Sequence, residues 1–179
     1  MLATQTISLN LLPRYDALAA TRRFYISPGD ADVTVTRDYK ISDADLWQIL
    51  TSPIMLSAVM KNAVKWSAVK RPGGRTMIGA ANHCAHGKGS LQYTYLDWHP
   101  FAYFTALGVE GATKFYETYE IEPLPNNAGS RLTLRWRLDT GLPRWVVKLV
   151  ASNARAKMGI GFLQMIEDYI AGVQNPTFQ

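Results

Sequence analysis

The stretch PRWVVKLVASNARAKMGIGFLQMIEDYIAGV, residues 143–173, decides the fold of this chain. Its apolar residues recur every three or four positions, which places them on one stripe of an α-helix. The predicted stripe consists of Val147, Ala151, Ala154, Met158, Phe162, Met165 and Tyr169. Its middle is small, because Ala151, Ala154 and Gly161 carry little side-chain volume. A helix that seals a packed core more often carries Leu or Ile there. A helix over a hollow can be small in the middle, with flexible Met residues around the gap. Both interpretations are open from this stretch alone.

The segments before this helix alternate between apolar and polar residues, as β-strands do. The predicted strands are Asp32–Ile41, Ala63–Lys70, Arg75–His86, Ser90–Trp98, Phe101–Val109, Thr113–Glu122 and Ser130–Leu138. Two short helices, Asp43–Leu50 and Ile54–Met60, separate the first two strands, and Ser42 is the predicted N-cap of the first. We therefore predict an α+β fold of order β-α-α-β-β-β-β-β-β-α. Seven antiparallel strands would curve around the long C-terminal helix, with the two short helices closing one end.

Length and composition set the limits on the class of protein. The 179 residues are 47% hydrophobic and 18% charged, which fits one globular domain. We divide the chain into an extension over residues 1–30, packed on the domain, and a domain over residues 31–179. The single cysteine, Cys84, excludes an internal disulfide framework and fits a reducing compartment. Met1–Leu12 lacks the basic region of a secretory signal, so we expect a cytoplasmic protein.

The net charge of +5 comes from dispersed basic residues. One gathering lies on the early turns of the predicted long helix and consists of Arg144, Lys148, Arg155 and Lys157. Such a set could meet an anionic membrane surface or nucleic acid, and a solvated helix face explains it as well. We predict no nucleic-acid partner. No run reaches the roughly 18 apolar residues of a membrane-spanning helix, so we also predict no stable membrane insertion.

The element order, together with several motifs, resembles the START-like (SRPBCC) helix-grip superfamily of polyketide cyclases and lipid-transport domains. The motifs that carry the resemblance are YKISDADLW (39–47), LDWHP (96–100), TYEIEP (118–123) and GSRLTL (129–134). A further motif, IGAANHCAHG (78–87), resembles the subgroup found ahead of nucleotide-cyclase domains in bacteria. The resemblance covers residues 32–173. It implies a cavity between the sheet and the long helix that takes a hydrophobic or amphipathic small molecule, lipid or polyketide-like.

The residues capable of holding a metal or attacking a substrate form no convincing site. On a strand, His83 points away from Cys84 and His86, because successive side chains alternate between faces. Cys84 and His86 share a face about 7 Å apart, which is long for a thiolate–imidazole pair. We therefore predict no metal and no cofactor, and we interpret Cys84 as a small core residue.

Glu117 is the most interesting polar residue of the predicted sheet. It shares a strand face with Phe115, Tyr119 and Ile121, so this carboxylate would look inward with them. A carboxylate in an apolar cavity has a raised pKa and can act as an acid or a base. A structural pairing with Arg37 or Arg135 is the alternative. Weak catalytic candidates are Glu117, Tyr95 and His86. The predicted ligand-binding residues are Tyr93, Tyr95, Tyr119, Trp136, Ala154, Met158, Phe162 and Met165.

Three functions follow from these observations. The first is a carrier or sensor of a hydrophobic small molecule. The second is an acid–base enzyme of the polyketide cyclase or dehydratase type that uses the same cavity. The third is a protein-interaction or regulatory module. A homodimer would form through apolar residues that fall away from the main stripe of the long helix, namely Leu149, Ile160, Leu163 and Ile170. The N-terminal extension is the other candidate to cover that face.

Overall fold

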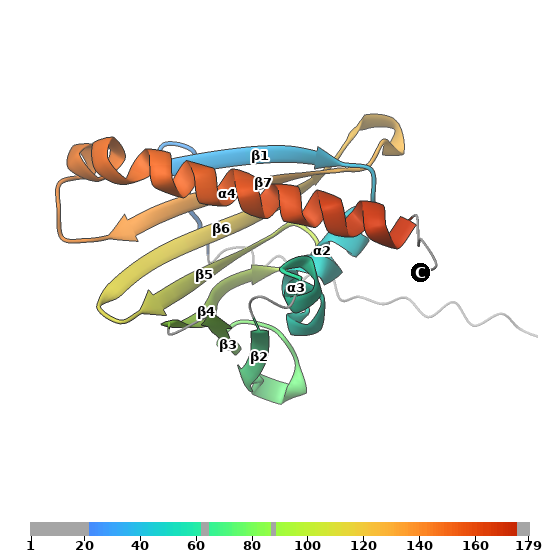
Figure 1. Cartoon of the computed structure of the whole chain (residues 1–179), viewed down its shortest axis with the longest axis horizontal. Coiled ribbons are helices and arrows are strands. Elements are labelled where there is room, and N and C mark those ends of the chain that lie inside the picture. The colour runs from blue at the N-terminus through green and yellow to red at the C-terminus, as the bar shows by residue number, and fades with distance from the viewer. Residues whose placement is uncertain (1–21, 62–64, 87–88, 175–179) are drawn as a thin grey trace, which may run out of the picture.

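A computed structural model describes residues 22–61, 65–86 and 89–174, and within these ranges it leaves out the side chains of His86, Val150, Ala151 and Gln174. These described residues form seven strands and three α-helices in the predicted order, and Figure 1 shows their arrangement. The first part contains β1 (Val33–Tyr39), α2 (Asp43–Thr51), α3 (Pro53–Val59) and β2 (Lys65–Lys70). The remainder contains β3 (Ala81–His86), β4 (Gly89–His99), β5 (Tyr103–Glu110), β6 (Thr113–Pro123), β7 (Ser130–Asp139) and α4 (Arg144–Gln174).

All seven strands form one antiparallel sheet with the order β1-β7-β6-β5-β4-β3-β2. The hairpins from β2 to β7 pair each strand with its neighbour in sequence, and β1 closes the order by pairing with β7. In Figure 1 the sheet curves beneath α4, which runs along it beside β1, and α2 and α3 lie under the C-terminal half of α4. The predicted α+β grip of a sheet around a long helix is confirmed.

The short helices are set by their caps. Ser42 accepts a hydrogen bond from the backbone N–H of Asp45 at 3.1 Å, which satisfies one of the free amides at the start of α2. Ser52 ends α2 and caps α3, where Pro53 occupies the first helical position. Both helices are therefore about two turns long, and α2 turns Leu46, Trp47 and Leu50 into the core. The predicted Ser42 cap is confirmed.

The third predicted strand was too long at its start. Residues 75–80 form bends and a turn, and β3 begins only at Ala81. Glycines cause the difference, because Gly73, Gly74 and Gly79 adopt positive φ angles of 58°, 75° and 79°, which turn the chain out of the strand direction. Residues 75–80 thus lead into β3 and are not part of the strand.

The long helix has the predicted length, but it is rotated about its axis relative to the predicted stripe. The buried residues of α4, among its described side chains, are Val147, Gly159, Leu163, Ile166 and Ile170. Ala154 is exposed and Met158 is 61% exposed, whereas Phe162, Met165 and Tyr169 are half-buried. Ala151 falls among the side chains that are not described. The stripe was misplaced because large apolar residues occur on nearly every side of this helix.

The same rotation corrects the face assigned to a homodimer. Leu163 and Ile170 belong to the core, and only Leu149 and Ile160 of the four residues are exposed. The described part of the N-terminal extension does not cover that helix face either. Residues 22–31 lie on the sheet face that points away from α4, since Ile26 donates its N–H to Thr118 Oγ1 at 3.1 Å and Thr118 alternates with cavity-facing neighbours.

This N-terminal segment covers a polar layer of the outer sheet face. Phe24 donates its N–H to Asp97 Oδ2 at 2.6 Å, and Ile26 is fully buried. Tyr25 donates to Glu120 Oε1 at 2.5 Å, and Glu120 in turn pairs with Arg135 at 2.7 Å. Residues 1–21 lie outside the described residues, so the domain boundary at residue 30 stays a prediction.

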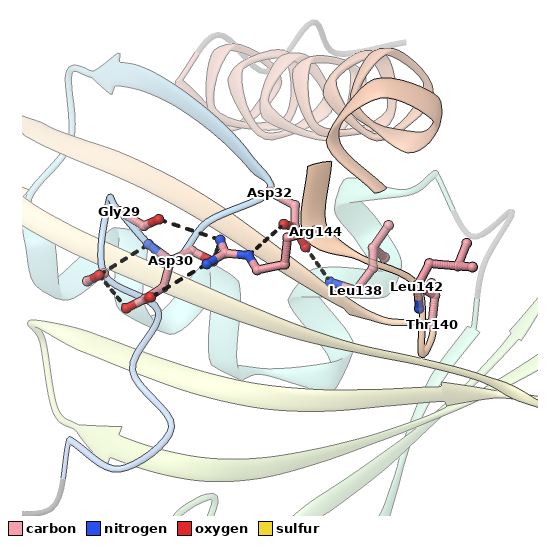
Figure 2. A network of polar contacts seen from close by, with 8 residues as sticks. Gly29, Asp30, Asp32, Leu138, Thr140, Leu142 and Arg144 are labelled. Atoms are coloured by element: carbon pink, nitrogen blue, oxygen red, sulfur yellow. Dashed lines mark hydrogen bonds and ion pairs between the residues drawn. The ribbon is translucent and has the colours of Figure 1, made fainter. Parts of the chain in front are cut away.

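The start of α4 is fastened to the segment that precedes β1, as Figure 2 shows. Arg144 donates to the backbone oxygen of Asp30 at 2.6 Å and lies 3.5 Å from Asp32 Oδ1. The other carboxylate oxygen of Asp32 accepts the backbone N–H of Leu138 at 2.9 Å. Asp32 therefore links the start of β1, the end of β7 and the first turn of α4.

Candidate ligand-binding cavity

A cavity of about 240 Å³ lies between α4, the concave face of the sheet and the two short helices. Most of its wall is apolar and aromatic. The sheet contributes Trp66, Cys84, Leu91, Tyr93, Phe104, Phe115, Glu117, Tyr119 and Trp136, with Glu110 at the end of β5. The helices contribute Leu50, Leu56, Met60, Arg155, Met158 and Phe162. Such a wall, apolar with a few polar groups, is typical of small-molecule sites.

Glu117 is the buried polar group of this wall, and only 8% of its surface is exposed. Its Oε2 accepts hydrogen bonds from the hydroxyls of Tyr93 at 2.9 Å and Tyr119 at 3.1 Å. Its Oε1 accepts one from the indole Nε1 of Trp136. The predicted alternatives are corrected here, because Arg37 pairs with Glu167 and Arg135 pairs with Glu120 on the opposite sheet face.

Two opposing influences act on the Glu117 carboxyl. Burial raises its pKa, whereas the bonds from Trp136, Tyr93 and Tyr119 and the charge of Arg155 lower it, and the net direction is upward. Burial also raises the pKa of both tyrosine hydroxyls well above the usual range, so they remain donors. A carboxylate has about four acceptor positions. Three are occupied, which leaves Oε1 able to accept one further hydrogen bond.

The sheet register brings these four side chains together. Glu117 pairs directly with Trp136 on β7, and both residues point to the concave face. Tyr93 on β4 reaches across β5 to the same carboxylate, and Tyr119 lies two residues further along β6. Each donor is thus fixed by a strand, which holds the carboxylate in one orientation.

The approach of α4 completes the arrangement. Gly159 packs directly on Trp136, where a Cβ atom would lie 2.7 Å from indole Cζ3. Because Gly159 has no side chain, α4 packs closely on the indole of Trp136, and the Nε1 of the same indole donates to Glu117. Arg155 places its guanidinium 4.5 Å from the ring centroid of Phe115, and the Phe162 ring meets that of Tyr119 edge-on at 6.2 Å.

The structure brings only some of the predicted residues to the cavity. Five of the eight predicted ligand-binding residues line it, namely Tyr93, Tyr119, Trp136, Met158 and Phe162. The other three do not line it: Tyr95 is buried behind the wall with its hydroxyl 3.2 Å from Asn82 Nδ2, Ala154 is exposed, and Met165 packs against the core. Of the weak catalytic candidates, the side chain of His86 lies outside the described residues. Binding roles for all eight remain predictions.

Sequence reasoning missed Arg155 and the aromatic residues Trp66 and Phe104. Arg155 was grouped with the solvated basic residues because the rotation of the helix was unknown. Trp66 had a signal, since it alternates with polar neighbours on its strand, whereas Phe104 had none, because Tyr103 and Leu107 make the opposite strand face apolar too. Cys84 also lines the cavity, and burial raises the pKa of its thiol to about 11, so it is not poised as a nucleophile.

Across residues 22–61, 65–86 and 89–174, no three His, Cys, Asp or Glu side chains gather in a way that could hold a metal ion. In the same described part of the chain, no helix is both long and apolar enough to cross a membrane.

Comparison with known proteins gives no match in sequence. No family model matches this chain, and no curated protein matches it either. Solved structures do match in fold. Protein MLL2253 from Mesorhizobium loti is 15% identical with a TM-score of 0.61, over 77% of this chain and 95% of that one. CalU16 from Micromonospora echinospora is 12% identical with a TM-score of 0.53, over 79% and 76%.

A third structure is DynU16, a protein in the dynemicin biosynthetic locus. It is 12% identical with a TM-score of 0.58, and the match covers 78% of this chain and 46% of DynU16. At these identities the likeness is one of fold alone. The chain therefore shares with these proteins a seven-stranded antiparallel sheet wrapped around a long C-terminal helix.

Proposed function

We propose that the cavity binds a compact hydrophobic molecule that donates one hydrogen bond to Glu117. The observation that carries the proposal is a buried carboxylate on an apolar wall, held by three donors with one acceptor position left over. The volume of about 240 Å³ lies just below the range of roughly 300–1,000 Å³ typical of drug-sized ligands. A ring system or a single short chain with a hydroxyl fits better than a two-chain lipid.

The preferred role is that of a carrier or sensor. The donors around Glu117 stabilise its charged form and fix its orientation, which suits recognition of a hydroxyl. The resemblance of residues 78–87 to the domains found ahead of bacterial nucleotide cyclases supports a sensor in particular. The single cysteine supports a cytoplasmic location.

A pair of probe molecules of similar shape tests the hydrogen bond. We expect the protein to bind 1-naphthol more tightly than 1-methylnaphthalene, because only the naphthol can donate to Glu117. A hydrogen bond to a charged group contributes about 1.5–3 kcal/mol, so the preference should be roughly tenfold or more. The Glu117→Gln variant should lose most of this preference for 1-naphthol. Equal affinity for both probes in the wild-type protein would contradict the proposed anchor.

The position of the ligand is tested by a matched pair of variants on α4. Met158 and Ile160 are both more than half exposed, but only Met158 lines the cavity. Met158→Trp should therefore weaken binding of 1-naphthol, while Ile160→Trp should leave it unchanged. Both substitutions are at the surface, so the fold should tolerate them. A similar effect of both would place the binding site elsewhere.

An acid–base enzyme is the second candidate, and the raised pKa of Glu117 favours it. The generic probe is 5-nitrobenzisoxazole, a compact aromatic molecule. When a base removes the proton on carbon 3, the N–O bond breaks and a coloured cyanophenolate forms. A catalytic Glu117 should open this ring far faster than acetate does at the same pH, and Glu117→Gln should abolish the excess rate. A rate no higher than that of acetate favours the carrier or sensor.

A further inference from the structure

The N-terminal end of α4 exposes large apolar side chains. Trp145 is 71% exposed and Leu149 is 74% exposed, and their spacing of four residues makes them neighbours on one helix face. Leu142, just before the helix, is 58% exposed. We call Leu142, Trp145 and Leu149 the apolar patch. In Figure 1 this end of α4 lies at the same end of the molecule as the β5–β6 turn, away from α2 and α3. A cluster of large, exposed apolar side chains is typical of interaction surfaces.

The charged side chains within residues 140–166 are all basic. Residues 140–166 contain four basic residues and no acidic one. Arg144 is engaged by Asp30 and Asp32, whereas Lys148 and Lys157 are exposed. The first turn of α4 contains no acidic residue. Lys148 and Lys157 are therefore the exposed cations that α4 presents near the apolar patch.

Aromatic, aliphatic and basic side chains on one surface fit a particular kind of partner. Tryptophan is enriched where proteins meet the bilayer interface, and apolar residues beside it enter the boundary between headgroups and acyl chains. Lysine beside them is attracted by anionic lipids. Nucleic acid would use the positive charge but not Leu149. A second copy paired symmetrically on this patch would bring Lys148 of each copy to the same interface, and like charges there repel.

We propose that the N-terminal end of α4 docks on the surface of an anionic lipid bilayer. Trp145 and Leu149 enter the headgroup region, and Lys148 and Lys157 lie against the anionic headgroups. This contact is peripheral, and it does not depend on the identity or presence of a ligand in the cavity.

Co-sedimentation with vesicles tests the proposal, with phosphatidylcholine alone compared to phosphatidylcholine mixed with phosphatidylserine. The full chain should bind the mixed vesicles and lose affinity as salt is added. One basic residue near an anionic surface accounts for roughly fivefold in affinity, so Lys148→Glu should weaken binding by at least about fivefold. The double substitution of Trp145 and Leu149 by Ser should weaken it as strongly. Ile54→Ser is the matched control, because Ile54 is 82% exposed on α3, outside the patch.

Three results would overturn the proposal. The first is equal affinity for neutral and mixed vesicles. The second is unchanged vesicle binding by the patch variants. The third is a wild-type dimer in sedimentation equilibrium without lipid that the Trp145 and Leu149 substitutions convert to a monomer, since a second copy would then occupy the patch. A failure here leaves the binding of 1-naphthol in the cavity unaffected.

Discussion

Substituting Gly159 by Ala should destabilise the protein, although alanine is the better helix former. A Cβ atom at this position would overlap the indole of Trp136 and lie 2.9 Å from Val35 Cγ2. The indole cannot move aside easily, because it is buried and its Nε1 is bonded to Glu117. Overpacking of this kind costs about 1–3 kcal/mol, while the gain in helix propensity is about 1 kcal/mol. The net loss in the free energy of unfolding should be about 0–2 kcal/mol.

Gly161 provides the control on the same helix. A Cβ atom there would meet no atom within 4 Å. Gly161→Ala should therefore stabilise the protein by roughly 0.5–1 kcal/mol, through helix propensity alone. Both variants gain the same helix propensity, so the difference between their free energies of unfolding reports the overpacking alone, about 1–3 kcal/mol.

Urea unfolding followed by circular dichroism measures both variants. The midpoints should shift in opposite directions or differ clearly, with similar slopes if the denatured state is unchanged. Equal stabilisation by the two alanines would refute the close approach of α4 to Trp136. It would also show that contact between Gly159 and Trp136 does not set which face of α4 is buried.

Three other perturbations test separate parts of the structure. Arg144→Ala should cost about 1–2 kcal/mol, because the Asp32 carboxylate, 2% exposed, is left without its cation; adding Asp32→Asn should recover part of the loss in urea unfolding. Ile26→Ala should lower the free energy of unfolding by about 2–4 kcal/mol, since Ile26 is fully buried and belongs to the folded unit; an unchanged midpoint would show that residues 22–31 are dispensable. Burial raises the pKa of Glu117 in the folded state, so the folded protein retains this proton at pH values where the unfolded chain has lost it. The resulting stability is present below about pH 4.3 and is lost as the pH rises through the folded pKa. The Glu117→Gln variant should not show this loss of stability with rising pH, which is measured as the free energy of unfolding across a pH series.

The sequence predicted the order of elements because each element carries a local signal. The strands alternate, Ser42 and Ser52 mark helix starts, and the long helix has no interior proline. The start of β3 was predicted too early because residues 75–80 were joined to the strand, whereas Gly79 turns the chain there. Local pattern thus predicted the type of each element better than its bounds.

The rotation of α4 could not be predicted from the helix alone. Large apolar residues such as Leu149, Met158 and Ile166 point in different directions around it, so several stripes are equally apolar. The correct face is set by Gly159, whose missing side chain admits Trp136 from β7. That fit depends on a sheet residue 23 positions earlier in the chain. Arg155 was missed as a cavity residue for the same reason.

Glu117 was found from alternation on its own strand, but its partners were not. Its donors come from β4, β6 and β7, and the register between those strands decides which side chains meet it. This arrangement connects the helix to the carboxylate through one ring, since Trp136 contacts Gly159 and also donates to Glu117. A displacement of α4 would therefore change the third donor to Glu117 and the cavity wall together. A ligand that moves the helix would alter the affinity of Glu117 for a proton, and by linkage the pH would alter the affinity for that ligand.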